Sequence, residues 1–250
     1  MKINLKKLVP LVLIKTFVIG NCVAMFLGTW PVNLPQWSYN PSEKETIGTL
    51  TQLISAKQDD PAPAAALGTL YFLHNELDRA ESAVQSAFIA YPDDPQTCAL
   101  YQAIQAKKAG AMWDFAFGQI KLRRLKTALM KLNTCAQNAP DALDVQIFAL
   151  ATFASVPKIG SNAATGLTFA QHMETRLHHQ QWADAPPALT ASAWLAIARV
   201  YLYFAQHDAT QKALWKIKAT HAWNAYQALN TAPEWLTNER EYVSTTLVKV

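Results

Sequence analysis

The chain has 250 residues, of which 51% are hydrophobic and 16% are charged, so it is long enough to bury a core in one or two domains. Its formal charge of +4 comes entirely from the lysines at positions 2, 6, 7 and 15, and the rest of the chain is neutral. A neutral folded part argues against nucleic-acid binding, which needs excess positive charge to contact phosphates. Glycine is scarce while Ala and Leu recur throughout, which predicts an all-α fold.

Residues 1–28 have the pattern of a membrane-targeting segment. Three lysines precede an apolar stretch over residues 8–28, which as a helix is about as long as a bilayer core is thick. Cys22-Val23-Ala24 offers a cleavage site, and the Lys15 side chain can reach the membrane surface, so a cleaved signal peptide and a retained anchor both stay open, with the anchor favoured. Because positive flanks stay in the cytoplasm, we expect the remaining chain to lie outside it.

An extended linker is predicted over residues 29–41, where prolines and aromatic residues gather: Trp30, Pro31, Pro35, Trp37, Tyr39 and Pro41. A helix is expected to begin at Ser42 and to run to about Lys57. Glu45 follows Ser42 by three residues, which is the spacing of a capping box.

Small and large apolar residues then recur at fixed spacings. One complete set is Leu67, Gly68, Tyr71, Ala80, Val84, Ala87 and Pro92. Its second half recurs at Ala128, Leu132, Cys135 and Pro140, and again at His221, Ala225, Ala228 and Pro233. Its first half recurs at Trp194, Ile197, Ala198 and Tyr201. This pattern resembles the tetratricopeptide repeat (TPR) family, in which small residues let two antiparallel helices approach closely and a proline ends the second helix.

The resemblance implies that residues 42–250 form a right-handed superhelical array of TPR-like antiparallel helix hairpins, an α-solenoid with an inner groove. Residues 96–170 also resemble a group of exported bacterial TPR-like proteins that carry the same features in the same order: Trp113, Ala139-Pro140-Asp141 and Val156-Pro157. This second likeness implies a periplasmic domain, anchored in the inner membrane or released by cleavage.

The copies are separated by irregular stretches. We expect helices over residues 95–108, ended by Gly110, over 114–138 and over 141–154, followed by a long turn from Val156 to Gly166. The last hairpin is expected to have long helices or a long turn. Cys98 and Cys135 occupy apolar positions of predicted helices, so we expect them to be buried free thiols and not a disulfide.

Motifs of known enzyme classes are missing from the sequence. It has no phosphate-binding glycine loop, no nucleophile elbow and no His-Glu-x-x-His, so we expect no catalytic activity and no cofactor. The histidine group at positions 172, 178 and 179 shares its helix with Arg176, whose charge would oppose a cation. We therefore interpret this group as a solvated polar face and expect no metal.

Two sets of residues are candidates for binding. By the TPR resemblance, Arg199 and Tyr203 would face the inner groove, and Trp113 has no evident role in the core. The basic stretch 107–131 includes Lys121, Arg123, Arg124 and Lys126, and it contrasts with an acidic stretch over residues 59–94. The two stretches either neutralise each other or leave a basic surface for an acidic partner or anionic lipid.

The function that these patterns favour is a non-catalytic TPR-like scaffold or adaptor in the bacterial cell envelope, with protein partners and a membrane contact through the N-terminal segment. The alternative is a small-molecule-binding accessory protein of an envelope transport system. A closed apolar pocket of ligand size would favour the alternative, and an open charged groove would favour the scaffold.

Overall fold

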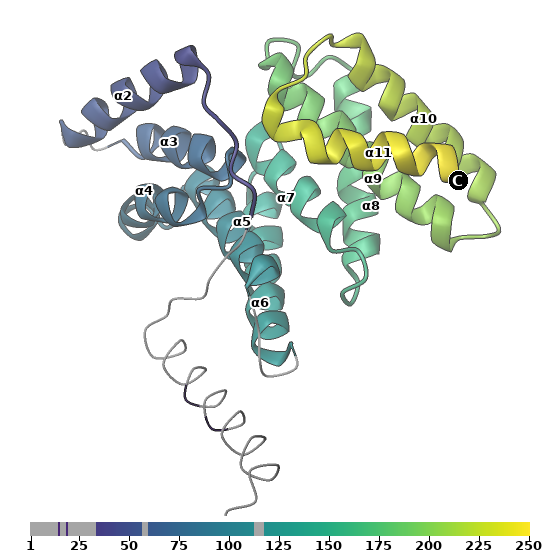
Figure 1. Cartoon of the computed structure of the whole chain (residues 1–250), viewed down its shortest axis with the longest axis horizontal. Coiled ribbons are helices and arrows are strands. Elements are labelled where there is room, and N and C mark those ends of the chain that lie inside the picture. Colours follow the sequence, from purple (N-terminus) through teal and green to yellow (C-terminus); the bar gives the residue numbers. More distant parts are fainter. Residues whose placement is uncertain (1–14, 16–18, 20–33, 57–59, 113–117) are drawn as a thin grey trace, which may run out of the picture.

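The computed structural model describes residues 15, 19, 34–56, 60–112 and 118–250. The predicted membrane-targeting segment and Trp113 thus lie outside the described residues. In the described part the fold is all-helical and contains no strand, as the composition predicts (Figure 1). Its elements are α2 (Pro41–Ser55), α3 (Ala62–Leu73), α4 (Leu77–Ala90), α5 (Pro95–Ala111), α6 (Gln119–Asn138), α7 (Leu143–Ser155), α8 (Asn162–His178), α9 (Pro187–His207), α10 (Lys212–Ala228), the 3-10 helix η1 (Glu234–Leu236) and α11 (Thr237–Lys249).

Local sequence signals set where several helices begin. Asn40 caps α2: its side chain accepts a hydrogen bond from the Glu43 amide, and the Glu43 carboxylate accepts one from the Asn40 amide. The capping box therefore lies two residues before the predicted Ser42 and Glu45 pair, because Pro41 suits the first turn of the helix, where no backbone N–H is needed. In the same way Asp94 caps α5 just before Pro95, by accepting from the Thr97 amide.

Successive helices pair and then stack. α3 packs on α4, α5 on α6, α7 on α8 and α9 on α10. The first helix of each pair also packs on the first helix of the next pair: α3 contacts α5, α5 contacts α7, and α7 contacts α9. In the same way α9 contacts α11. The alternate helices α4, α6, α8 and α10 each contact the first helix of the following pair, or α11 at the end. Four helix pairs and a final helix thus form one continuous body.

The core follows this stacking order. One buried cluster joins α3, α4, α5, α6 and α7, and a second, larger one is centred on α9, α10 and α11. Among the described helices, only α9 is long and apolar enough to cross a membrane. Most of α9 is buried inside the body, as expected for the core helix of a folded domain.

The first predicted hairpin is present, with a tight helix contact at Gly68. A Cβ atom at this position would lie 2.1 Å from Cγ2 of Val84 on α4 and 3.3 Å from Cδ2 of Leu100 on α5. Three helices therefore meet where residue 68 has no side chain. The turn of this hairpin falls at residues 74–76, where Asn75 adopts a positive φ of 63°.

Other boundaries differ from the sequence-based expectation. α5 continues through Gly110 to Ala111, because a single glycine weakens a helix without breaking it. α6 begins at Gln119, after Gly118 with its positive φ of 81°. The turn after α7 ends early, and Gly166 lies within α8, packed against Phe153 and Val200. The last hairpin has long helices, which was one of the two expected outcomes.

Cys98 and Cys135 form a disulfide, so the prediction of two free thiols was wrong. Their Cα atoms lie 6.0 Å apart, on α5 and α6. Both residues occupy buried or half-buried positions of the core, as expected, but the antiparallel packing of α5 on α6 brings the two side chains to the same level. The sequence separation of 37 residues gave no sign of this pairing.

Candidate interaction surfaces

Side chains of α3, α5 and α7 meet on one surface where these helices stack. The Lys107 ammonium of α5 lies 4.4 Å above the ring of Phe72 and donates a hydrogen bond of 3.2 Å to the Phe72 carbonyl oxygen. Phe72 in turn packs edge-on against Phe148 of α7, with ring centres 5.9 Å apart. Lys107 is partly exposed, yet surrounding protein lowers its pKa to about 8, because the charged form is poorly solvated there. Surrounding protein thus crowds the Lys107 ammonium although its side chain is partly exposed.

Arg199 of α9 continues this surface toward α11. Its guanidinium donates to both carboxylate oxygens of Glu239, at 2.6 Å to Oε1, and lies 4.7 Å above the ring of Tyr242. The negative charge of Glu239 also counteracts part of the pKa depression of Lys107. Glu239 therefore sits near two cations from two different helix pairs. The candidate Arg199 thus forms an ion pair with Glu239 between α9 and α11, and its predicted groove position stays a prediction.

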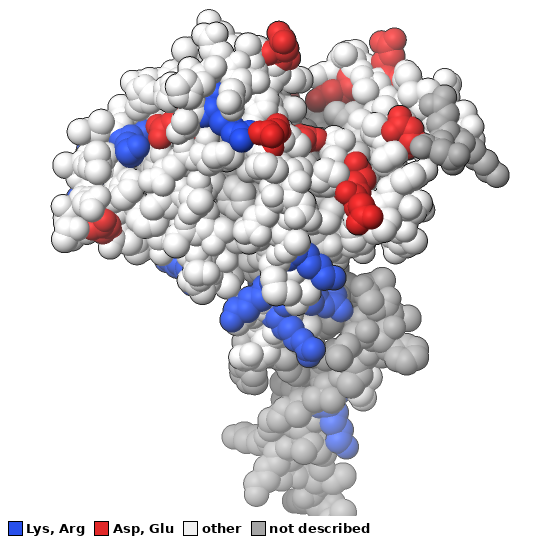
Figure 2. All heavy atoms as spheres, turned by 180° about the vertical axis from the view of Figure 1, so that it is seen from behind, with Lys and Arg blue, Asp and Glu red and all other residues white. Residues whose placement is uncertain are grey.

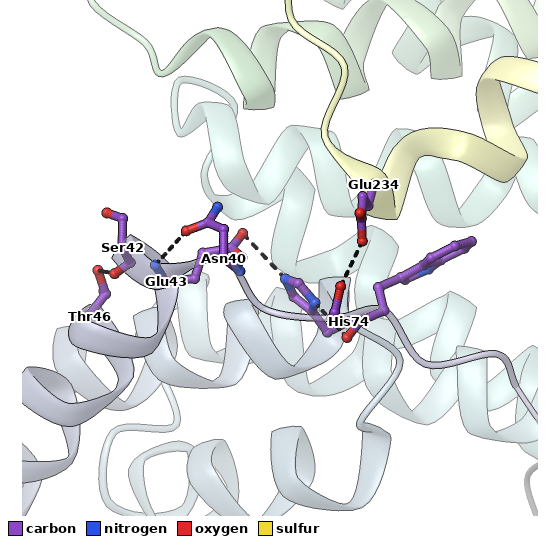
Figure 3. A network of polar contacts seen from close by, with 8 residues as sticks. Asn40, Ser42, Glu43, Thr46, His74 and Glu234 are labelled. Atoms are coloured by element: carbon purple, nitrogen blue, oxygen red, sulfur yellow. Dashed lines mark hydrogen bonds and ion pairs between the residues drawn. The ribbon is translucent and has the colours of Figure 1, made fainter.

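Residues 34–40, named here the strap, run in extended form alongside this surface, in agreement with the predicted linker. His74, which is almost fully buried, stacks on Tyr39 with ring centres 4.0 Å apart, and its Nδ1 lies 3.1 Å from the Trp37 carbonyl oxygen. Its Nε2 lies 3.3 Å from Glu43 of α2 (Figure 3). The turn between α3 and α4 thus holds the strap in place.

The strap also contacts the far end of the chain. The Ser38 hydroxyl donates a hydrogen bond of 2.9 Å to the Glu234 carboxylate of η1, which lies 196 residues later (Figure 3). In Figure 1 the strap passes between the first helix pair and α11. The first and last elements of the body are therefore bridged by one extended segment.

Tyr203, the second predicted groove residue, lies near the end of α9. Its ring stacks on His207 with centres 4.2 Å apart and meets Phe204 edge-on at 5.7 Å. Tyr203 and Arg199 are one turn apart on the same helix, as predicted. No contact of the described residues joins Tyr203 to the Arg199–Glu239 pair, so the structure does not bring these candidates into one site.

A basic face lies on α6. Arg123, Arg124, Lys126 and Lys131 are exposed and Lys121 is half-exposed. Figure 2 shows the Lys and Arg side chains of this helix gathered on the end of the body that projects downward, away from most Asp and Glu side chains. Lys121 and Arg124 have further interactions, whereas Arg123 and Lys126 form no ion pair with any described residue.

Only part of the basic stretch neutralises the acidic one. Lys108 of α5 forms ion pairs of 2.6 Å with both Asp78 and Glu81 of α4, and Gln105 donates to the same Glu81. These contacts join the first two helix pairs. The charged side chains of α6 take no part in these ion pairs. Lys108 of α5 therefore neutralises part of the acidic stretch, whereas the basic surface lies on α6.

A hollow of about 450 Å³ lies at the start of α7 and the loop between α8 and α9. It is open to solvent, and its lining mixes apolar and polar side chains, among them Asp144, Gln180, Gln181, Trp182 and Leu189. Burial raises the pKa of the Asp144 carboxyl. The hollow is not closed, and polar groups contribute a substantial part of its lining.

One group of side chains has the composition of a metal site. The ligand atoms of Glu174 and His178 on α8 and of His221 on α10 all lie within 4.8 Å of one another. His172 and His179, the other members of the predicted histidine group, are not part of it. Arg176 instead forms an ion pair of 2.6 Å with Asp141. Burial lowers the pKa of His172, and the charge of Arg176 lowers it further.

Sequence reasoning missed Glu174 and His221 because they lie on different helices, far apart in the chain. A weak signal was present, since His221 stands where the TPR pattern prefers a small residue. No sequence pattern related Lys107 to Glu239 either. Their electrostatic interaction depends on how the helices stack.

Comparisons with protein-family models, with curated proteins and with solved structures give no match to this chain.

Proposed function

We propose that this protein is a non-catalytic, TPR-like scaffold that holds a protein partner outside the cytoplasm. The observation that carries the proposal is the packing order of the helices. α3, α5, α7, α9 and α11 contact each other in sequence, while their partner helices contact only neighbouring members of this row. This order is compatible with a stacked array of helix hairpins, in which one row would line an inner surface and the other an outer surface, and it supports the proposal in that respect.

The disulfide supports a location outside the cytoplasm. Disulfides persist in oxidising compartments such as the periplasm and are rare where thiols are kept reduced. The Cys98–Cys135 bond therefore agrees with the basic leader and apolar stretch of residues 1–28, which we propose to anchor the protein in the inner membrane. Cleavage of this segment on export remains compatible with the same topology.

Two surfaces can contact the partner. One side of the row α3, α5, α7 and α9 offers the aromatic and charged groups around Lys107 and, separately, Tyr203 near the end of α9, and the basic face of α6 offers Arg123 and Lys126. We propose that the basic face attracts an acidic protein surface, because exposed unpaired cations steer association with a partner of opposite charge. The open and partly polar hollow near Trp182 offers less support for the alternative role in small-molecule binding, which calls for an enclosed apolar site.

Site-specific photo-crosslinking in the native host tests the scaffold proposal. A photoreactive residue replaces Tyr203 on the inner side, Arg123 on the basic face, or Ile217 as a control, because Ile217 is 67% exposed on the outer helix α10. A discrete protein adduct from Tyr203 or Arg123, absent from Ile217, supports the proposal. Adducts of equal yield from all three positions, or no adducts, contradict it.

A charge-reversal variant then tests whether the basic face of α6 contributes to binding of the partner. The variant Arg123→Glu/Lys126→Glu is expected to lose, at low salt, the adduct that is formed from position 203. It should keep its helical circular dichroism spectrum. Vesicles with and without anionic lipid form the second arm of this experiment. If the parent binds anionic vesicles but the variant still forms the protein adduct, the basic face contacts lipid, and the assignment to an acidic protein is wrong.

A further inference from the structure

We propose that Glu174, His178 and His221 form a binding site for a divalent first-row transition metal, best suited to Zn²⁺, that joins α8 to α10. Two imidazoles and one carboxylate are the ligand set of many three-ligand zinc sites, in which water fills the fourth position. Hard cations such as Mg²⁺ and Ca²⁺ prefer oxygen ligands, and the two imidazoles select against them.

The positions of the ligands follow from the helix packing. Glu174 and His178 are four residues apart on α8 and so share one face of this helix. α8 and α10 both pack on α9, and the Trp194 ring of α9 lies between them, 5.5 Å from the ring of His178 and 6.5 Å from that of His221. Trp194 thus forms an apolar floor beneath two imidazoles that are exposed on their other side.

The spacing of the imidazoles fits a shared ion. Two imidazoles bound tetrahedrally to one Zn²⁺, with Zn–N bonds of about 2.0–2.1 Å, place their ring centres about 5 Å apart. The ring centres of His178 and His221 are 5.2 Å apart. The ligand atoms, within 4.8 Å of each other, need to close by up to about 1.5 Å to reach the separation that these bond lengths require. Both histidines are exposed and can make this adjustment by rotating their side chains.

Glu174 is oriented by a neighbour, as metal-bound carboxylates commonly are. The buried Tyr201 donates a hydrogen bond of 2.6 Å to Oε2 of Glu174, which fixes the carboxylate. Oε1 accepts no hydrogen bond from the described residues and is left for the ion. Lys218 lies 3.5 Å from Oε2, and its positive charge opposes a second cation. Its side chain is 34% exposed, so it can move into solvent when the metal binds.

Zn²⁺ titration of the untagged, full-length protein, stripped with a chelator, tests the site by isothermal calorimetry. We expect one Zn²⁺ per chain and a raised melting temperature in the presence of the ion, because a ligand that binds only the folded state stabilises it. His178→Ala and His221→Ala are expected to weaken binding by more than the roughly 10–100-fold that loss of an outer-shell partner causes. Lys218→Met is expected to tighten binding, since it removes the opposing charge.

His172→Ala and His179→Ala are the matched controls, because both are exposed histidines of the same region that lie outside the group. They should bind Zn²⁺ like the parent. Co²⁺ provides a readout independent of the variants' stability: bound between two imidazoles and a carboxylate, it should give the intense visible absorption of a low-symmetry, near-tetrahedral site. The proposal is wrong if the parent binds no Zn²⁺, if Ca²⁺ binds equally well, or if His221→Ala and the control variants bind alike.

Discussion

Gly68 provides the sharpest test of the first helix hairpin. Its hypothetical Cβ would lie 2.1 Å from Val84 Cγ2, whereas carbon atoms in ordinary contact are about 3.5–4.0 Å apart. Gly68→Ala therefore requires a displacement of about 1.5 Å between α3 and α4 or a new rotamer of Val84. Val84 is fully buried and β-branched, so few alternative rotamers are open to it.

The expected effect combines two opposing contributions. Alanine is about 1 kcal/mol more favourable than glycine within a helix, while overpacking a core costs about 1–3 kcal/mol. Because the contact is so short, we expect overpacking near the upper end of that range and a net destabilisation of about 2 kcal/mol. Gly110→Ala is the control: a Cβ there meets no atom within 4 Å, so this variant should gain about 0.5–1 kcal/mol.

Urea denaturation followed by circular dichroism measures both variants, and hydrogen exchange shows whether the loss is confined to α3 and α4. In a Val84→Ala background, Gly68→Ala should no longer destabilise, because the methyl group in its way is gone, and the coupling energy between the two sites should reach about 2 kcal/mol. A Gly68→Ala variant as stable as the parent, or additive effects of the two substitutions, would refute the close approach of α3 and α4 at this point.

Three further predictions concern the disulfide, the N-terminal segment and Lys107. Replacing Cys98 and Cys135 by alanine should lower the free energy of unfolding by about 4 kcal/mol, as expected for a loop closed across 37 residues, and more than one free thiol per chain in the purified parent, where only Cys22 stands outside the disulfide, would contradict this. Deleting residues 1–28 should release a soluble helical protein from the membrane fraction, and a deleted protein that still sediments with membranes would exclude the anchor. The pKa of Lys107 is about 8 in the folded state against an ordinary 10.5, so the unfolded state holds this proton more tightly. The parent should therefore gain stability relative to Lys107→Met as the pH rises from about 8 to 10.5, and this gain should be lost as the pH falls back through about 8. Chemical denaturation at a series of pH values measures the difference.

The sequence by itself determined the class of fold and much of its local detail. The helix start after Asp94 follows from a side chain that acts within a few residues of itself, and such a local signal can be read from the sequence, whereas the start of α2 was predicted two residues late. The spacing of Gly68, Ala80 and Val84 predicted a close helix contact because in a helical hairpin these positions face each other. The basic residues of α6 were visible in the sequence, but whether they pair with the acidic stretch or form an exposed face was left open by it.

Tertiary structure alone decided which distant residues meet. The disulfide, the Ser38–Glu234 hydrogen bond and the grouping of Glu174 with His221 each join segments that no local pattern relates. Arg199 illustrates the difference: its helix was predictable, but its pairing with Glu239 depends on how α11 packs on α9. Periodicity fixes which side of a helix is apolar, whereas the register and angle between packed helices are set by the shapes of all the side chains in the contact, and these cannot be read from either helix alone.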